Sequence, residues 1–182
     1  MATGAYISFV AISLAVLLFP GPSILLIVAN GLHRGVRVGL FTVAGGIVAM
    51  LVQLLVALAG LRSVETVFSN GLTYIRWAGV AYLLYIGVQR WRGQAHAELR
   101  GWKLRSYRSA VIDGFVVALT NPGTMLFFVA FFPQFVNDDR PAGPQLLLMA
   151  GTFMVLTTIV DIAYALLSGR VGTYLHQPDR TI

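Results

Sequence analysis

An aspartate inside an apolar stretch is the residue of this chain best placed to do chemistry. Asp161 lies in "LTTIVDIAYALL", where it is the only charged residue. If this stretch crosses a membrane, a charged carboxylate there costs at least roughly 2.5 kcal/mol, so a polar cavity or partner is expected. We predict that Asp161 binds a substrate ammonium or exchanges a proton, because burial favours the neutral form of a carboxyl group. The alternative is a structural acceptor for a polar side chain on a neighbouring helix.

Two breaks containing proline each precede an apolar run, in "LLFPGPSILLIVA" (17–29) and "VALTNPGTMLFFVA" (117–130). A proline costs roughly 3 kcal/mol in a helix interior, and in lipid the freed backbone groups need polar side chains or a wet cavity. The helix starts at Pro22 and Pro122 would present unpaired N–H groups and a partial positive charge, which suit a carboxylate. The alternative is a pair of simple kinks that serve packing.

Other polar residues indicate packing or exclude whole classes of site. Gln53 interrupts "MLVQLLVAL", and an amide in lipid normally bonds across helices, so packing is the alternative to substrate contact. The three histidines lie in predicted loops or the tail, which excludes a catalytic base or metal ligand within the membrane. Cysteine and a Walker-type phosphate loop are absent. We therefore predict no catalytic residue, metal or cofactor, and a gradient rather than ATP as the energy source.

Membrane-spanning helices must position these residues. Hydrophobic residues make up 57% of the 182 residues and charged residues 11%, with a mean hydropathy of +0.78, whereas soluble domains have about 25% charged residues. The pattern predicts an all-α, polytopic membrane helical bundle in a single domain over 1–182, with helices 1 and 4 broken by proline. Five apolar runs are close to bilayer length: 5–30, 38–61, 70–91, 111–135 and 144–169.

Basic residues predict the orientation of these spans. If successive spans alternate in direction, all of the 13 Lys and Arg residues except Arg62, Arg76 and Arg140 fall on one side. The positive-inside rule places that side, with the 90–108 loop and the C-terminal tail, in the cytoplasm and the N-terminus outside. Orientation therefore explains the net charge of +6 better than a nucleic-acid partner does.

The two proline breaks also suggest an internal repeat. A linker at 92–110 separates a three-span part, 1–91, from a two-span remainder, 111–182. Because the fourth predicted span runs opposite to the first, the breaks would enter the membrane with opposite polarity, as in the inverted repeats of many secondary transporters. The sequence thus predicts a partial 3+3 inverted repeat with an incomplete second unit.

The ordered motifs resemble the LysE/RhtB family of amino-acid exporters over nearly the whole chain. "FPGPSILLIVANGLHRGVRVGLFTVAGG" is similar to the start of that family, "IRWAGVAYLLYIGVQRWR" to its third span and "DGFVVALTNPGTMLFFVAFFPQFV" to its fourth. The resemblance implies a multi-pass protein of the bacterial inner membrane that exports amino acids or close derivatives, usually coupled to the proton gradient. It implies central positions at Gly21, Pro22, Asn121, Pro122 and Asp161.

The leading hypothesis is a secondary exporter of a small zwitterionic solute. The helix ends at Pro22 and Pro122 would hold its carboxylate, and Ser23 and Asn121 would orient it. Asp161 would meet the ammonium or exchange a proton. Gln53 completes the predicted substrate-binding set.

Two departures from the family favour an alternative from another class. Position 123 is Gly, where the family commonly has Lys after Asn-Pro, and no sixth span follows the fifth. The alternative is a non-transporting membrane subunit or a truncated inactive exporter. The lipid bilayer is an expected partner. The face against which a sixth helix would pack is left open, and a second copy could bind there to form a homodimer.

Overall fold

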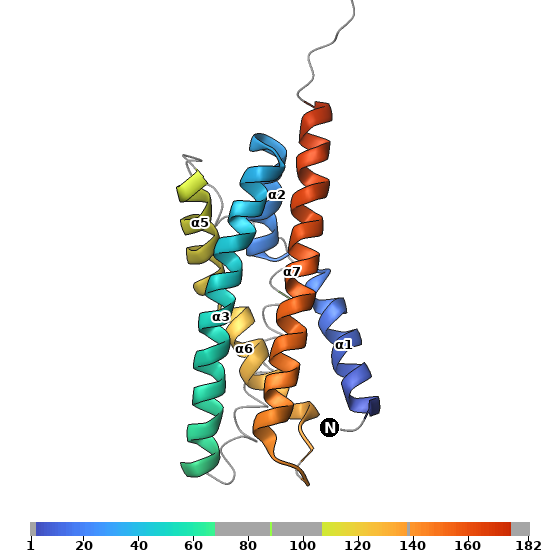
Figure 1. Cartoon of the computed structure of the whole chain (residues 1–182), viewed down its shortest axis with the longest axis vertical. Helices are drawn as coiled ribbons and strands as arrows, with labels where there is room; N and C mark the ends of the chain where they lie inside the picture. Colours follow the sequence, from blue (N-terminus) through green and yellow to red (C-terminus); the bar gives the residue numbers. More distant parts are fainter. Residues whose placement is uncertain (1–2, 68–87, 89–106, 138, 176–182) are drawn as a thin grey trace, which may run out of the picture.

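The structure, a computed structural model, describes residues 3–67, 88, 107–137 and 139–175. The regular elements in these ranges are all helical (Figure 1), so the predicted helical membrane bundle is confirmed. The predicted third span, 70–91, lies outside the described residues apart from position 88. The elements are α1 (Thr3–Leu17), α2 (Pro22–Arg34), α3 (Val36–Val67), α5 (Tyr107–Leu119), α6 (Pro122–Phe131), the 3-10 helix η2 (Phe132–Phe135) and α7 (Ala142–Leu175).

In the part of the chain that the structure describes, two helices are long and apolar enough to cross a bilayer by themselves. The stretches Val36–Ala57 in α3 and Ala142–Tyr174 in α7 have mean hydropathies of 2.3 and 2.0, and about 20 apolar residues suffice for one crossing. α1 and α2 pass the same test only as a pair, which is bent by 53°. The predicted break in the first span is therefore present.

Both breaks end one helix and begin another at a proline. α1 ends at Leu17 and α2 begins at Pro22, while α5 ends at Leu119 and α6 begins at Pro122. Proline is tolerated at the first position of a helix because its missing N–H would have no intrahelical partner there. The breaks are thus interruptions of the backbone ladder, rather than bends within a continuous helix.

The two broken pairs run in opposite directions through the bundle. In Figure 1, α1 and α2 rise from the end marked N, whereas α5 and α6 descend from the other end. α3 descends and α7 ascends beside them. These directions agree with the opposite polarity expected for an inverted repeat, and the division into repeat units at 1–91 and 111–182 stays a prediction.

Glycines allow the closest helix contacts. α3 packs against α5, and α2 packs against α7. A Cβ added at Gly45 of α3 would overlap the carbonyl oxygen of Val111 in α5, and one added at Gly114 of α5 would overlap the Thr42 carbonyl oxygen in α3. Small residues at membrane helix interfaces permit this approach of backbones. Gly45 and Gly114 therefore allow α3 and α5 to pack closely.

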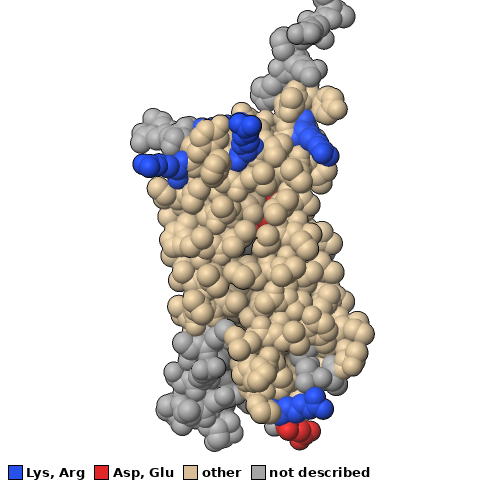
Figure 2. Space-filling model, in the orientation of Figure 1, with Lys and Arg blue, Asp and Glu red and all other residues tan. Residues whose placement is uncertain are grey.

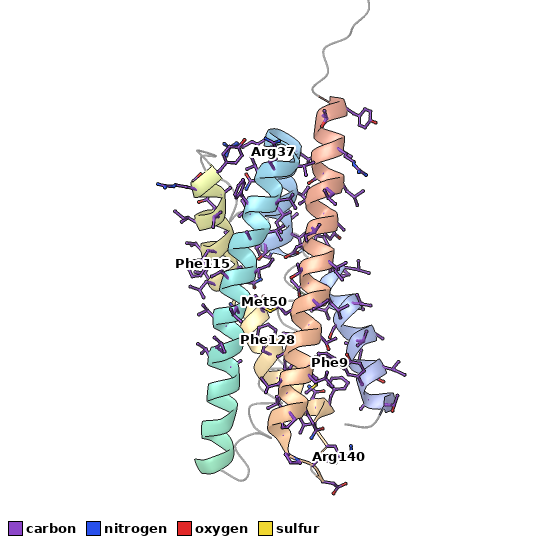
Figure 3. The ribbon with its side chains drawn as sticks, viewed as in Figure 1. Phe9, Arg37, Met50, Phe115, Phe128 and Arg140 are labelled. Atoms are coloured by element: carbon purple, nitrogen blue, oxygen red, sulfur yellow. The ribbon has the colours of Figure 1, made fainter. Side chains whose placement is uncertain are left out.

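Charged side chains gather at the two ends of the bundle. Figure 2 shows basic residues at the end where α2 stops and α5 starts, and an Asp beside an Arg at the opposite end. Arg37 and Arg140 mark these two ends in Figure 3. The broad band between them is almost entirely uncharged on this face, as expected for a surface that faces lipid.

Candidate functional site

A cavity of about 1010 Å³ lies between the helix breaks and the long helices α3 and α7. Each of the described α-helices contributes to its wall. Met50 of α3, one of the lining residues, lies near mid-height of the bundle in the view of Figure 3. The volume of the cavity is at the upper end of the roughly 300–1,000 Å³ typical of small-molecule sites.

Most of the predicted substrate-binding residues border this cavity. Gly21 and Ser23 reach it from the first break, Asn121 from the second, Gln53 from α3 and Asp161 from α7. Pro22 and Pro122 begin α2 and α6 directly beside these lining residues. The fold therefore brings two breaks that are about 100 residues apart in sequence onto one hollow.

Asp161 is buried in the cavity wall, with 7% of its surface exposed. Among the described residues, no side chain forms a hydrogen bond or ion pair with its carboxylate. The structural alternative, in which Asp161 accepts a hydrogen bond from a neighbouring helix, thus has no partner there. A buried acidic group of this kind requires a bound cation, a proton or water.

Gln53 supports the second break. Its Nε2 donates to the carbonyl oxygens of Ala118 and Leu119, both at 3.0 Å, and lies 3.4 Å from that of Asn121. These carbonyls lie at the C-terminal end of α5, where helix carbonyls lose their intrahelical donors. The packing alternative therefore holds for the amide nitrogen, and Oε1 is buried without a hydrogen-bond partner.

Tyr164 supports the first break by a hydrogen bond, as Gln53 supports the second. Its hydroxyl donates to the Leu18 carbonyl oxygen at 3.1 Å, just after the end of α1. Tyr164 belongs to α7, three residues after Asp161. Each break thus receives a donor from a long helix that belongs to the other half of the chain.

The N-terminus of α2 faces the cavity without a side-chain cap. Its N-cap residue, Gly21, is extended (φ −91°, ψ −179°) and makes no side-chain hydrogen bond to the helix. The N–H of Leu25 makes a 2.9 Å bond to the Gly21 carbonyl, so the N–H groups of Ser23 and Ile24 lie ahead of the helical ladder. Both residues line the cavity, and the helix end favours a negative ligand group.

Several lining residues were not among those predicted from the sequence. Thr42 accepts from Asn30 Nδ2 at 2.8 Å and donates to the Val38 carbonyl at 3.0 Å. Thr157 has a buried hydroxyl with no partner. Its spacing of four residues from Asp161 places both on one helix face, and this was the sequence signal that could have found it.

Apolar side chains that the sequence did not identify also line the cavity, and three of them are phenylalanines. Phe127 and Phe131 come from α6, and Phe153 comes from α7. Their positions in apolar runs gave no signal, because lipid-facing and cavity-facing phenylalanines have the same hydropathy.

Comparisons with known proteins assign the chain to a family. The family model of the LysE type translocator matches residues 14–182. A membrane protein of uncharacterized function from Vibrio cholerae is 29% identical over 89% of this chain and 80% of its own length. A homoserine/homoserine lactone efflux protein from Salmonella typhimurium is 28% identical, covering 88% and 79%.

A leucine efflux protein from Salmonella typhimurium is 24% identical over 93% of this chain and 81% of its own length. No solved structure matches the chain. Since the family model spans nearly all of it, this membrane protein belongs to the LysE type translocator family.

Proposed function

We propose that this protein exports an amino acid or a small amino-acid derivative from the cytoplasm in exchange for protons. The observation that carries the proposal is the cavity itself, because both helix breaks open onto it and it contains the buried Asp161 carboxylate. Two relatives are a homoserine/homoserine lactone efflux protein and a leucine efflux protein, which supports this class of solute. Burial of a carboxylate in the membrane is costly, and among the described residues no side chain pairs with Asp161, so a solute or a proton is the partner that we propose for it.

The two charged groups of a zwitterion match two parts of the cavity. The substrate carboxylate lies against the N-terminal ends of α2 and α6, where N–H groups and the partial positive charge of the helices favour an anion. Ser23 and Asn121, which border these ends, orient it. The substrate ammonium binds Asp161, which reaches the cavity from α7. Sites beside broken helices near the middle of the membrane are common in secondary transporters.

Competition at Asp161 couples the substrate to the proton. The carboxylate binds either an ammonium or a proton, so release of the substrate outside allows a proton to replace it. Loss of that proton to the cytoplasm then prepares Asp161 for the next substrate. Export of a neutral zwitterion for one proton moves one positive charge inward, so the membrane potential contributes about 2.3 kcal/mol per 100 mV.

Alternating access follows from movement of the two halves about the cavity. The Tyr164 bond to Leu18 and the Gln53 bond to Ala118 each join one half to the other beside the cavity, so the halves turn about these two links. The protein spans the bacterial inner membrane. By the positive-inside rule, the basic end of its bundle, with Arg34, Arg37 and Arg170, faces the cytoplasm. The N-terminus then lies outside.

Growth in the presence of inhibitory amino acids or analogues tests the function directly. Cells that express the chain should tolerate a subset of single amino acids at concentrations that stop control cells, and labelled solute should leave these cells faster. Dissipation of the proton gradient should abolish the difference. If expressing and control cells show equal tolerance and equal efflux across all amino acids, the export function is wrong.

A further inference from the structure

A cluster of phenylalanines separates the cavity from the end of the bundle that carries Arg140. In Figure 3, Phe128 lies below the cavity-lining Met50, and Phe9 lies below Phe128 in the direction of Arg140. Because the basic end of the bundle faces the cytoplasm, the cluster lies on the outer side of the cavity. This outer phenylalanine cluster consists of rings from α1, α6, η2 and α7: Phe9, Phe127, Phe128, Phe131, Phe132, Phe135 and Phe153.

The central rings of the outer phenylalanine cluster are closed to water. Phe9 and Phe128 have 0% of their surface exposed, and Phe132 has 1%. Apolar side chains such as Leu54 and Met149 pack around the same rings. Hydrophobic constrictions of this kind close a path by excluding water, and a zwitterion would have to give up its hydration to enter one. A solute that leaves the cavity in this direction therefore needs the rings to part.

Phe9 is the ring through which α1 meets this cluster. Its centroid lies 5.4 Å from that of Phe132 and 5.6 Å from that of Phe135, in edge-to-face contact with both rings of η2. A hydrogen bond of 2.8 Å between the Tyr6 hydroxyl and Thr152 Oγ1 joins α1 to α7 at the same end. At the outer end, the first half of the chain thus meets the second half through side chains.

The halves meet differently at the cytoplasmic end. There, a Cβ added at Gly172 of α7 would overlap the Leu32 carbonyl oxygen of α2, and one added at Gly169 would overlap the backbone nitrogen of Val36. Glycine contacts of this type bring the helix backbones themselves together. Separation of the halves at the cytoplasmic end must therefore part backbones, whereas at the outer end it breaks contacts between rings.

We infer that the outer phenylalanine cluster is the extracellular gate of the transporter, which opens when Phe9 moves away from η2. This inference rests on the proposed export function and adds the place at which the solute leaves. The links at Leu18 and Gln53 lie beside the cavity, so rotation of the halves about them carries Phe9 with α1 and Phe132 with η2. With these rings apart, the cavity is joined to the outer solution.

A reversible cross-link across the gate tests this inference in the full-length protein. The chain has no cysteine, so Phe9→Cys with Phe135→Cys provides two thiols that a short bifunctional methanethiosulfonate can join. This cross-link should abolish efflux of labelled leucine and homoserine from proteoliposomes, and a reductant should restore it. Val155→Cys with Ile159→Cys is the matched control, because both positions are exposed and lie one turn apart on α7. Its cross-link joins no two helices and should leave efflux unchanged.

Labelling of a single thiol tests the opening itself. Phe9→Cys places a thiol at a fully buried position, so an impermeant methanethiosulfonate added from outside should react slowly with the resting protein. Export of leucine or homoserine should raise that rate at least about tenfold, because a resting protein populates a minor state at only about 0.1–10%. Ile7→Cys, at an exposed position of α1, should show no such change. Phe135→Cys removes only a half-buried ring, so it reports on the same contact where Phe9→Cys does not fold.

The outcomes separate the gate from the function beneath it. Undiminished efflux after complete cross-linking of the Phe9→Cys and Phe135→Cys pair, verified by mass, would overturn the gate and leave amino-acid export intact. Labelling at positions 9 and 135 that export leaves unchanged would do the same. Export of no amino acid by the unmodified protein would overturn the gate and the proposed function together.

Discussion

Gln53 of α3 donates its side-chain amide to the carbonyl oxygen of Ala118, 3.0 Å away at the end of α5. The Tyr164 hydroxyl of α7 does the same for the Leu18 carbonyl, at 3.1 Å beyond the end of α1. Each helix break is therefore stabilised from a long helix of the other half. In lipid, where water cannot satisfy freed carbonyls, this exchange of donors allows both breaks to exist beside one cavity.

Replacement of Gln53 by leucine should destabilise the protein. Gln53→Leu removes the donor to the Leu119 carbonyl and one of the two donors to the Ala118 carbonyl, which also accepts from the Asn121 N–H. A buried polar group left unpaired costs about 1–3 kcal/mol. Thermal or denaturant unfolding in detergent measures the change. Gln134→Leu is the control, because Gln134 is exposed and bonds only to the Ala130 carbonyl of its own segment. Equal stability of the two variants would show that Gln53 does not support the break.

Loss of the Tyr164 hydroxyl should have a smaller effect. Tyr164→Phe removes one hydrogen bond, worth about 1 kcal/mol or less between membrane helices. The unfolding midpoint should fall slightly, and amide hydrogen exchange should increase around Leu18, where the carbonyl loses its donor. Tyr174→Phe changes a ring that is 78% exposed and should alter neither quantity. Unchanged exchange around Leu18 in Tyr164→Phe would contradict the proposed support of α1.

A methyl group at Gly45 should separate α3 from α5. The added Cβ of Gly45→Ala would overlap the Val111 carbonyl oxygen, and overpacking of this kind costs about 1–3 kcal/mol. Gly151→Ala provides the matched helix substitution, because nothing lies within 4 Å of its added Cβ. We expect only Gly45→Ala to lower the free energy of unfolding. The opposite order of stability would rule out the close contact at Gly45.

The absence of cysteine makes the membrane orientation directly measurable. A single cysteine in Asp139→Cys should react with a membrane-impermeant maleimide added to intact cells from which any outer membrane has been removed. One in Arg170→Cys should react only after the membrane is permeabilised. These expectations follow from the basic end of the bundle facing the cytoplasm. The reverse labelling pattern would invert the proposed topology and the direction of transport.

The sequence predicted the features that depend on local chemistry. Pro22 and Pro122 identified both breaks, because a proline fixes where a helix starts whatever surrounds it. Asp161 stood out because its charge is costly in an apolar run. Local polar residues predicted four of the residues that line the cavity, Ser23, Gln53, Asn121 and Asp161, and the family resemblance added Gly21.

The roles that depend on tertiary packing could not be predicted in the same way. An amide such as Gln53 can support a backbone or bind a solute, and only its position beside Ala118 decides which. Phe127 and Phe153 had no signal, since apolar residues that face lipid, core or cavity are alike in a membrane helix. Thr157 could have been found from its helical spacing to Asp161, but its unpaired hydroxyl is visible only in the fold.

Proton-driven export by an Asp161→Asn variant tests the central claim most directly. The variant keeps the size of the side chain and removes the group that would alternate between ammonium and proton. Asp139→Asn, at an exposed position just before the start of α7, is the matched control. The measurement is efflux of the best exported amino acid from proteoliposomes under an imposed proton gradient, with gel filtration confirming that each variant is folded. The account predicts loss of proton-driven efflux in Asp161→Asn alone, and undiminished efflux in that variant would contradict it.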